Sequence, residues 1–229
     1  MDGRSEMVPE QVRVPVFPLE NVVLFPGLQV PLHIFEARYR SMTSAALAGD
    51  RRIAMAVVRP EFRAEMHGNP PLFPICCEGS VLRAEQLADG RFNILLGGTR
   101  RLRILHEDPT SDERPYRVAL AQPLEDHEPE DERVRIRALR SETFAMLQQL
   151  VARVAPARAS VLEQQRLDRV DDRTFVNTIA QSMDFPVSEK QALLEADSIR
   201  ERYERLSSLL RFRLAEVTRG GVEGPDALQ

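Results

Sequence analysis

The sequence predicts an α+β protein with a β-rich first part and a helical second part. Short apolar runs broken by proline and glycine fill residues 11–124, which is typical of strands joined by tight turns. An acidic cluster at 125–132, EDHEPEDE, then marks a boundary. Beyond it, apolar residues recur at helical spacing, so 125–218 is expected to form a helical subdomain. Residues 1–10 and 219–229 are expected to be flexible tails.

Six apolar or alternating runs in the first part are candidate strands. They lie at 12–17, 28–34, 52–58, 77–87, 91–107 and 116–124. The sequence ADG at 88–90 separates two of them and is typical of a hairpin turn, in which the glycine takes a positive φ. One helix is expected at 36–49, with Gly49 at C′, the position after a helix where left-handed residues are common. Its shared face is expected to hold Tyr39, Met42 and Ala46.

The second part shows helical stripes and capping signals. A second helix is expected near 172–183. Ser188 with Gln191 forms a candidate capping box for a short helix, and Ser198 with Glu201 forms another for the long last helix. The first helix of this part is expected to end before Pro156. Its apolar stripe comprises Leu139, Met146, Leu147, Leu150, Val151 and Val154.

The most apolar segment is repeatedly interrupted by proline. Residues 17–40 read FPLENVVLFPGLQVPLHIFEARYR. Pro26 and Gly27 fit the two central positions of a type II turn, whose second position needs a positive φ. Pro18 and Pro31 cannot donate to a sheet, so they are expected at strand ends or edges. The segment therefore predicts strand, turn, strand and helix.

Composition excludes several classes of protein. No apolar run reaches the roughly 18 residues of a membrane-spanning helix, and the first residues carry no apolar signal region, so a cytoplasmic protein is expected. The net charge of −4 favours neither nucleic acid nor an anionic membrane. Lys190 is the only lysine and follows no glycine-rich loop, so a nucleotide-binding P-loop is absent. A Ser–Lys catalytic pair would have to use this same residue, at the start of a predicted helix.

The sequence predicts no metal site, cofactor or catalytic residue. Cys76 and Cys77 are adjacent, so they are not expected to bridge or to complete a zinc site. They are interpreted as buried small apolar residues, with a redox role as the alternative. The histidines are scattered without metal-ligand spacing, and no G-x-S-x-G nucleophile motif occurs. The histidines are His33, His67, His106 and His127.

Three segments together carry a family resemblance. FPLENVVLFPGLQVPLHIFEARYRSM at 17–42 resembles the start of the substrate-binding N-terminal domain of Lon ATP-dependent proteases. The segment at 74–105 is similar to the second motif of that family, a D-G hairpin followed by a strand ending in Gly-x-x-Arg, here Gly98 and Arg101. Residues 171–210 are similar to the helical part of the family.

The resemblance implies a fold and a function. The fold would be a PUA-like β pseudobarrel followed by a helical bundle with a long C-terminal helix. The chain resembles standalone bacterial members, without the ATPase and peptidase of a full Lon. It is therefore expected to be a non-enzymatic module that binds unfolded or extended polypeptides in protein quality control, with a protease or chaperone as a further partner and a homo-oligomer compatible with the sequence. The candidate contacts, some of which could instead be core, are Phe25, Leu28, Leu32, His33, Ile34, Phe35, Arg38 and Tyr39.

Two other functions stay open. PUA-like folds often bind RNA, and Arg100, Arg101 and Arg103 cluster on one predicted strand. Against RNA binding, this half of the chain is slightly acidic and no aromatic residues interleave with the arginines, which favours a solvated face or salt bridges. A hydrolase would need a deep pocket that gathers histidine, cysteine and carboxylates.

Overall fold

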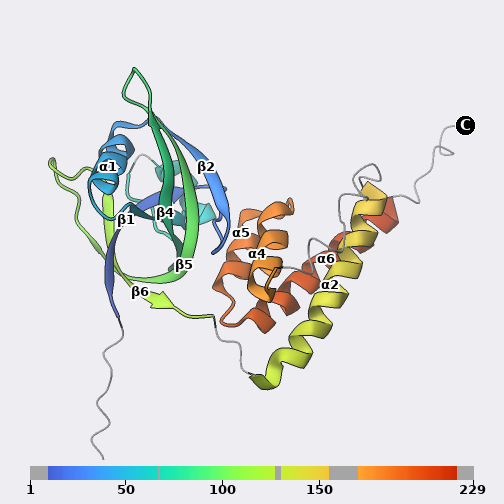
Figure 1. Ribbon diagram of the computed structural model, residues 1–229. Coiled ribbons are helices and arrows are strands. Elements are labelled where there is room, and N and C mark those ends of the chain that lie inside the picture. Colours follow the sequence, from blue (N-terminus) through green and yellow to red (C-terminus); the bar gives the residue numbers. More distant parts are fainter. Residues whose placement is uncertain (1–9, 67, 127–129, 155–169, 221–229) are drawn as a thin grey trace, which may run out of the picture. The chain divides into compact units, whose positions relative to one another are not determined.

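The computed structural model describes residues 10–66, 68–126, 130–154 and 170–220 (Figure 1). The chain divides into two compact units, Met1–Glu125 with Asp184–Leu194 and Asp126–Met183 with Glu195–Gln229. The sequence had assigned residues 184–194 to the helical part, but this segment groups with the β-rich unit. Of the expected tails, residues 1–9 and 221–229 lie outside the described residues, and the last helix continues to Gly220.

The first unit contains a strand in each of the six predicted runs. The strands are β1 (Val12–Leu19), β2 (Gln29–Ile34), β3 (Arg52–Val57), β4 (Ile75–Gln86), β5 (Phe92–Asp108) and β6 (Arg117–Leu124). The unit also contains α1 (Ala37–Ala48), η1 (Pro60–Glu65) and α5 (Val187–Glu195). The expected combination of strands and helices in an α+β fold is confirmed.

The sheet closes on itself through its longest strand. Its order is β2-β5-β4-β3-β1-β6, and β5 also pairs with β6. Five strands therefore form a ring, and β2 is added to the outside of the ring along β5 (Figure 1). The first half of β5, residues 92–97, lies between β2 and β4, while residues 101–103 lie between β4 and β6. β5 thus connects the ring to a three-stranded arm, which consists of β2, residues 92–97 of β5 and residues 80–86 of β4.

The change of partner along β5 occurs at Gly98. There the Phe-Pro-Gly corner, residues 25–27, meets the strand. The Leu28 N–H donates to the Phe25 carbonyl across the turn (3.2 Å), and Gly27 has a φ of 84°. The predicted turn at Pro26 and Gly27 is therefore confirmed. The Gly27 N–H donates to the Gly98 carbonyl (2.9 Å), and the Gly98 N–H donates to the Leu28 carbonyl (2.7 Å).

The two main apolar clusters of the first unit lie within and beside this ring. One gathers the buried face of α1 and the arm, and includes Ile34, Tyr39, Met42, Phe92 and Ile94. The other is built from small and branched residues of the ring, such as Val14, Val16, Ala54, Ala119 and Ala121. The predicted helical face of Tyr39, Met42 and Ala46 is buried, as expected from its spacing.

The end of α1 differs from the prediction. Gly49 is the C-cap residue with a φ of −112°, so it does not take the left-handed conformation. Arg51 takes it instead, with a φ of 62°. Its N–H donates to the Ala46 carbonyl (2.9 Å), so the left-handed residue that follows the helix comes two positions later than predicted. No sequence pattern predicts this conformation, because arginine is not a residue that favours positive φ.

Side-chain to backbone hydrogen bonds explain why α5 belongs to the β-rich unit. The Gln191 side chain donates to the Ile75 carbonyl of β4 (2.8 Å), and the Arg101 guanidinium donates to the Leu194 carbonyl in the last turn of α5 (3.0 Å). The predicted capping box of Ser188 with Gln191 is wrong, because Ser188 lies inside the helix and Gln191 bonds to the sheet. A cation near the last carbonyls of a helix also complements its dipole.

The second unit contains α2 (Arg133–Val154), α4 (Asp172–Ser182), α6 (Ile199–Gly220) and the short η2 (Glu130–Glu132). The Ser198 hydroxyl accepts from the Glu201 N–H (3.1 Å), so the N-cap bond of the predicted box is present. Arg202 is fully buried and donates to Asp126 (2.9 Å) and Asn177 (2.9 Å). The buried residues of the last helix include Ile199, Tyr203, Leu206 and Leu210.

Gly98→Ala is expected to destabilise the first unit. A Cβ at Gly98 would lie 2.4 Å from the Phe25 carbonyl oxygen and 3.1 Å from the Cys77 sulfur, so the turn would have to move. Overpacking of this kind costs about 1–3 kcal/mol. Urea denaturation followed by circular dichroism measures the loss. Gly68→Ala is the matched control, since its Cβ would only reach 3.4 Å from the Glu65 carbonyl; equal stabilities of the two variants would contradict the expectation.

Candidate functional site

Three of the eight predicted contact residues are part of the core. Phe25 is 0% exposed, Ile34 1% and Tyr39 4%. The Tyr39 ring packs edge-on against Phe17 at 4.7 Å, and burial raises the pKa of the Tyr39 hydroxyl to about 12. Because these side chains do not reach the surface, their assignment as contacts is corrected: they are part of the core.

Arg38 is engaged by its own unit and is not a free charge on a rim. Its guanidinium donates to the Glu36 carboxylate (3.0 Å) and to the carbonyls of Met66 (2.8 Å) and Gly68 (3.4 Å). It also lies over the Tyr39 ring, 4.6 Å from its centre. Arg38 therefore fixes the segment after η1 to the start of α1.

The exposed members of the predicted set lie at the end of β2. Phe35 is 62% exposed and stacks on the ring of His33, with 6.3 Å between ring centres. The His33 Nδ1 lies 2.8 Å from the Asn93 side-chain oxygen on β5. Leu28 and Leu32 are only partly buried, and Leu32 packs against the core cluster under the arm.

The surface around Phe35 continues across the arm. The register pairs Pro31 with Leu95 and His33 with Asn93, and it pairs Asn93 in turn with Glu85 of β4. The Asn93 amide donates to the Glu85 carboxylate (3.4 Å). Leu82 is 48% exposed on the same face, where it covers Gly97. We call these residues the arm face. They are Pro31, His33, Phe35, Leu82, Glu85, Asn93 and Leu95, of which Pro31, Phe35, Leu82 and Leu95 are apolar.

Sequence reasoning missed the β4 and β5 members of the arm face. The predicted hairpin turn at 88–90 carried a signal for them, because a turn fixes which residues of two strands lie opposite each other. It would have placed Glu85 opposite Asn93. Leu82 could not have been found in this way, because the register shifts between Val81 and Arg83. Such a bulge is a tertiary feature of the strand pair.

The predicted arginine cluster does not form a basic surface. Arg101 is 2% exposed and bonds to backbone carbonyls, so its assignment to a solvated face is corrected. Arg100 donates to the Glu78 carboxylate (2.6 Å), and Arg103 is the exposed member. Nucleic acid would need several cations on one accessible face, which these three residues do not provide.

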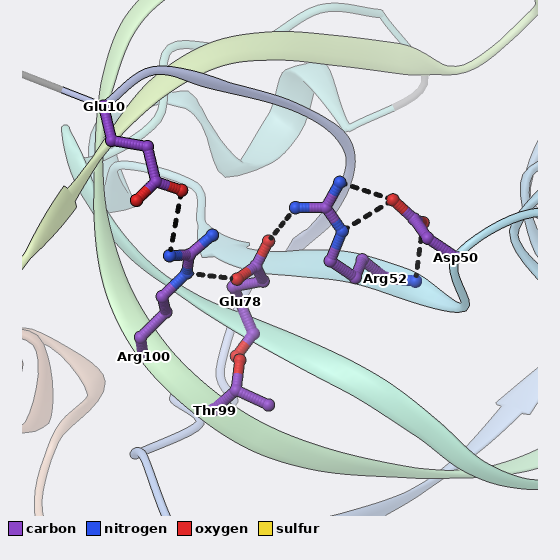
Figure 2. Close-up of polar contacts among 6 residues, drawn as sticks. All are labelled: Glu10, Asp50, Arg52, Glu78, Thr99 and Arg100. Atoms are coloured by element: carbon purple, nitrogen blue, oxygen red, sulfur yellow. Dashed lines mark hydrogen bonds and ion pairs between the residues drawn. The ribbon is translucent and has the colours of Figure 1, made fainter.

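Glu78 organises a chain of charges across three strands, as Figure 2 shows. Its side chain is 3% exposed and accepts from Arg52 of β3 (3.1 Å) and from Arg100 of β5 (2.6 Å). Arg52 also donates to Asp50 (2.6 Å), and this hydrogen bond lowers the pKa of the Asp50 carboxyl. Arg100 reaches Glu10 at 3.4 Å. A buried carboxylate held by two arginines is the arrangement that satisfies its charge.

Both cysteines are buried, as their interpretation required. Cys76 is 1% exposed, and burial raises the pKa of its thiol to about 12. The thiolate is the reactive form, so a thiol with this pKa is inert at neutral pH. Within the described ranges, no three histidine, cysteine or acidic residues gather as metal ligands would. No helix of the described chain combines the length and apolarity needed to cross a bilayer.

This fold is that of solved N-terminal domains of Lon proteases. The N-terminal domain of Mycobacterium avium complex Lon protease matches with a TM-score of 0.68 at 19% identity, covering 87% of this chain and 98% of that one. A Lon N-terminal domain protein from Xanthomonas campestris matches with a TM-score of 0.58 at 18% identity, covering 86% and 98%.

Sequence comparison leads to the same family. The ATP-dependent protease La (LON) substrate-binding domain matches residues 13–211, and the chain belongs to this family. It is 29% identical to the Lon protease of Escherichia coli K12 over 204 residues, which are 88% of this chain and 25% of that protein. It is 32% identical to Lon protease 2 of Herpetosiphon aurantiacus, with 87% and 24% covered. The chain thus spans about a quarter of the length of these curated relatives.

Glu78→Gln is expected to lower the free energy of unfolding by about 2 kcal/mol. Each arginine donates to a different oxygen of Glu78, so in glutamine one guanidinium would face an NH2 donor and both would lose the negative charge. Breaking a buried pair is costly, although the partial exposure of Arg52 and Arg100 reduces the loss. Glu10→Gln is the control, because its carboxylate is exposed and an exposed pair is worth about 0–1 kcal/mol. Urea titrations of both variants measure the difference, and a Glu78→Gln variant as stable as the control would refute a structural role for the network.

The native thiols are expected to resist an aromatic disulfide reagent at pH 8. The raised pKa of Cys76 leaves almost no thiolate there, and both sulfurs are shielded from solvent. In urea the same protein should release two equivalents of chromophore at once. Reaction of the folded protein within minutes would instead support the redox alternative.

Proposed function

We propose that this chain is a non-enzymatic polypeptide-binding module. The observation that carries the proposal is Phe35, a large aromatic side chain that is 62% exposed at the end of an edge strand. Exposed apolar patches on soluble domains mark interaction sites. The description of the family as a substrate-binding domain supports the same reading.

Binding would combine apolar contact with strand pairing. Phe35 and the apolar row of the arm face offer an open apolar surface, which suits side chains of an unfolded segment. A neighbouring strand edge offers backbone groups, and extended peptides add to such edges. Because both contributions depend little on sequence, the module would accept many clients, which is the requirement of protein quality control.

The expected partners are unfolded or extended polypeptides in the cytoplasm, with a protease or chaperone as the second class. The closed five-stranded ring supports assignment to the PUA-like pseudobarrels. RNA binding has lost its main support, since Arg101 is buried and Arg100 is held by Glu78. A filter-binding salt series with single-stranded RNA is expected to show no salt-sensitive affinity; a steep salt dependence would reinstate the alternative.

Phe35→Ser is expected to weaken binding of an unfolded polypeptide about tenfold, which corresponds to about 1.4 kcal/mol. The probe is fluorescently labelled, reduced and carboxymethylated α-lactalbumin, and anisotropy measures its affinity. Phe212→Ser is the matched control, because Phe212 is 60% exposed on α6 of the other unit. It should bind within about twofold of the wild type.

Circular dichroism must show both variants folded, which is expected because both phenylalanines are exposed. Leu32→Ser would be a poorer test, since Leu32 packs on the core and its loss should destabilise the unit. Equal affinity of the Phe35→Ser variant and the wild type would remove the observation on which the proposal depends.

A further inference from the structure

One edge of the arm is left without a neighbouring strand. β3 pairs with β4 only from Met55–Cys77 to Arg52–Ser80, and the last contact is the Val81 N–H donating to the Arg51 carbonyl (2.8 Å). Beyond Val81, no described strand pairs with β4 on that side. Residues 82–86 are all exposed. Figure 1 shows this part of β4 in the green hairpin that projects past the rest of the sheet.

Arg51 is the residue that keeps this edge open. Its left-handed conformation turns the chain away from β4, so β3 cannot run alongside residues 82–86. Its Nε donates to the Val81 carbonyl (2.9 Å), which holds the turn against the strand. A non-glycine residue at positive φ is an uncommon conformation that the surroundings must impose.

The backbone groups of Ala84 and Gln86 face outward from this edge. The Gly98 N–H is directed at β2, so alternation along β5 directs Asn93 and Leu95 at β4. Their register partners, Glu85 and Arg83, therefore direct their backbone N–H and C=O groups at β5. The residues between and after them, Ala84 and Gln86, present N–H and C=O groups to the open side.

The opposite edge of the arm, β2, is less able to accept an added strand. The Leu28 carbonyl accepts from Gly98, so alternation along β2 directs residues 28, 30, 32 and 34 at β5 and residues 29, 31 and 33 outward. Pro31 lies at the centre of the outward set and has no N–H to donate. Proline at this position is a common protection of an edge strand. The β4 edge carries no such protection.

A shallow groove of about 580 Å³ lies over β4 and β5 beside the open edge, lined by residues 82–85, residues 93–95 and Arg51. Leu82 supplies an apolar side chain that is 48% exposed. Two guanidinium groups, of Arg51 and Arg83, line the groove together with one carboxylate, of Glu85, which already accepts from Asn93. The groove is therefore complementary to a segment that carries an apolar and an acidic side chain.

We propose that residues 82–86 of β4 bind an extended polypeptide segment as an added strand. The segment would bond to Ala84 and Gln86, place an apolar side chain on Leu82 and, two residues along on the same face, an acidic side chain beside Arg83. Five residues of strand span about 17 Å, which is enough for a segment of five or six residues. The inference rests on the proposed function and names the backbone edge through which it acts.

The test uses a fluorescein-labelled nine-residue peptide of alternating threonine and valine, in which one central valine is replaced by aspartate. Ala84→Pro removes an outward N–H without touching a bond to β5, and should weaken binding about tenfold. Ala84→Val keeps the N–H and should bind within about twofold of the wild type. The same peptide N-methylated at alternate residues should not bind the wild-type protein, and a lysine in place of the aspartate should weaken binding.

Amide hydrogen exchange on the wild-type protein provides a second measurement that does not depend on the folding of a variant. The Ala84 and Gln86 amides should exchange more slowly when the peptide is bound, and unchanged exchange there would overturn the inference. If Ala84→Pro binds as the wild type while Phe35→Ser does not, the inference fails and the proposed function stands. If neither this peptide nor the unfolded protein binds the wild type, both fail. A wild type that sediments as a dimer while Ala84→Pro sediments as a monomer would assign the edge to a second copy of the chain and overturn the proposal.

Discussion

The close approach of the Phe-Pro-Gly corner to Gly98 is the contact on which the rest of the first unit depends. Two backbone hydrogen bonds join the corner to β5, and the Phe25 carbonyl occupies the space that a side chain at position 98 would need. The contact lies where β5 changes partner from β2 to β6. Without it, the arm and the closed ring would have no fixed relation, because β2 joins the sheet only through β5.

Three residues further along β5, Arg101 binds a second element, the helix α5. Its guanidinium is buried and donates to the last turn of α5, so a helix from late in the sequence is held on the β-rich unit. Between these two positions, Thr99 donates to the Glu78 carbonyl, and Arg100 donates to the Glu78 carboxylate. A four-residue stretch of one strand thus fixes the corner, the neighbouring strand and the returning helix.

The arm owes its accessible surfaces to this division of β5. Strands in the closed ring have neighbours on both sides, whereas the arm beyond the corner has two edges. Pro31 protects one edge and Arg51 keeps the other open, through a missing donor in the first case and a left-handed turn in the second. The same projection exposes Phe35 and Leu82. The exposed apolar residues that we propose as contacts therefore lie on the arm and not around the closed ring.

Local patterns in the sequence predicted the strands and helices, the Pro26–Gly27 turn and the buried face of α1, because hydrophobic periodicity, turn chemistry and helical spacing are local properties. The family followed from the resemblance of three segments. Which side of each apolar run is core depends on tertiary contacts: Phe25 and Ile34 are buried, whereas Phe35, the residue after Ile34, is exposed. The burial of Arg101, the bulge at Leu82 and the left-handed Arg51 likewise arise from contacts between segments far apart in the chain. Local patterns fix what a segment can form, but burial depends on what packs against it, and no local pattern contains that partner.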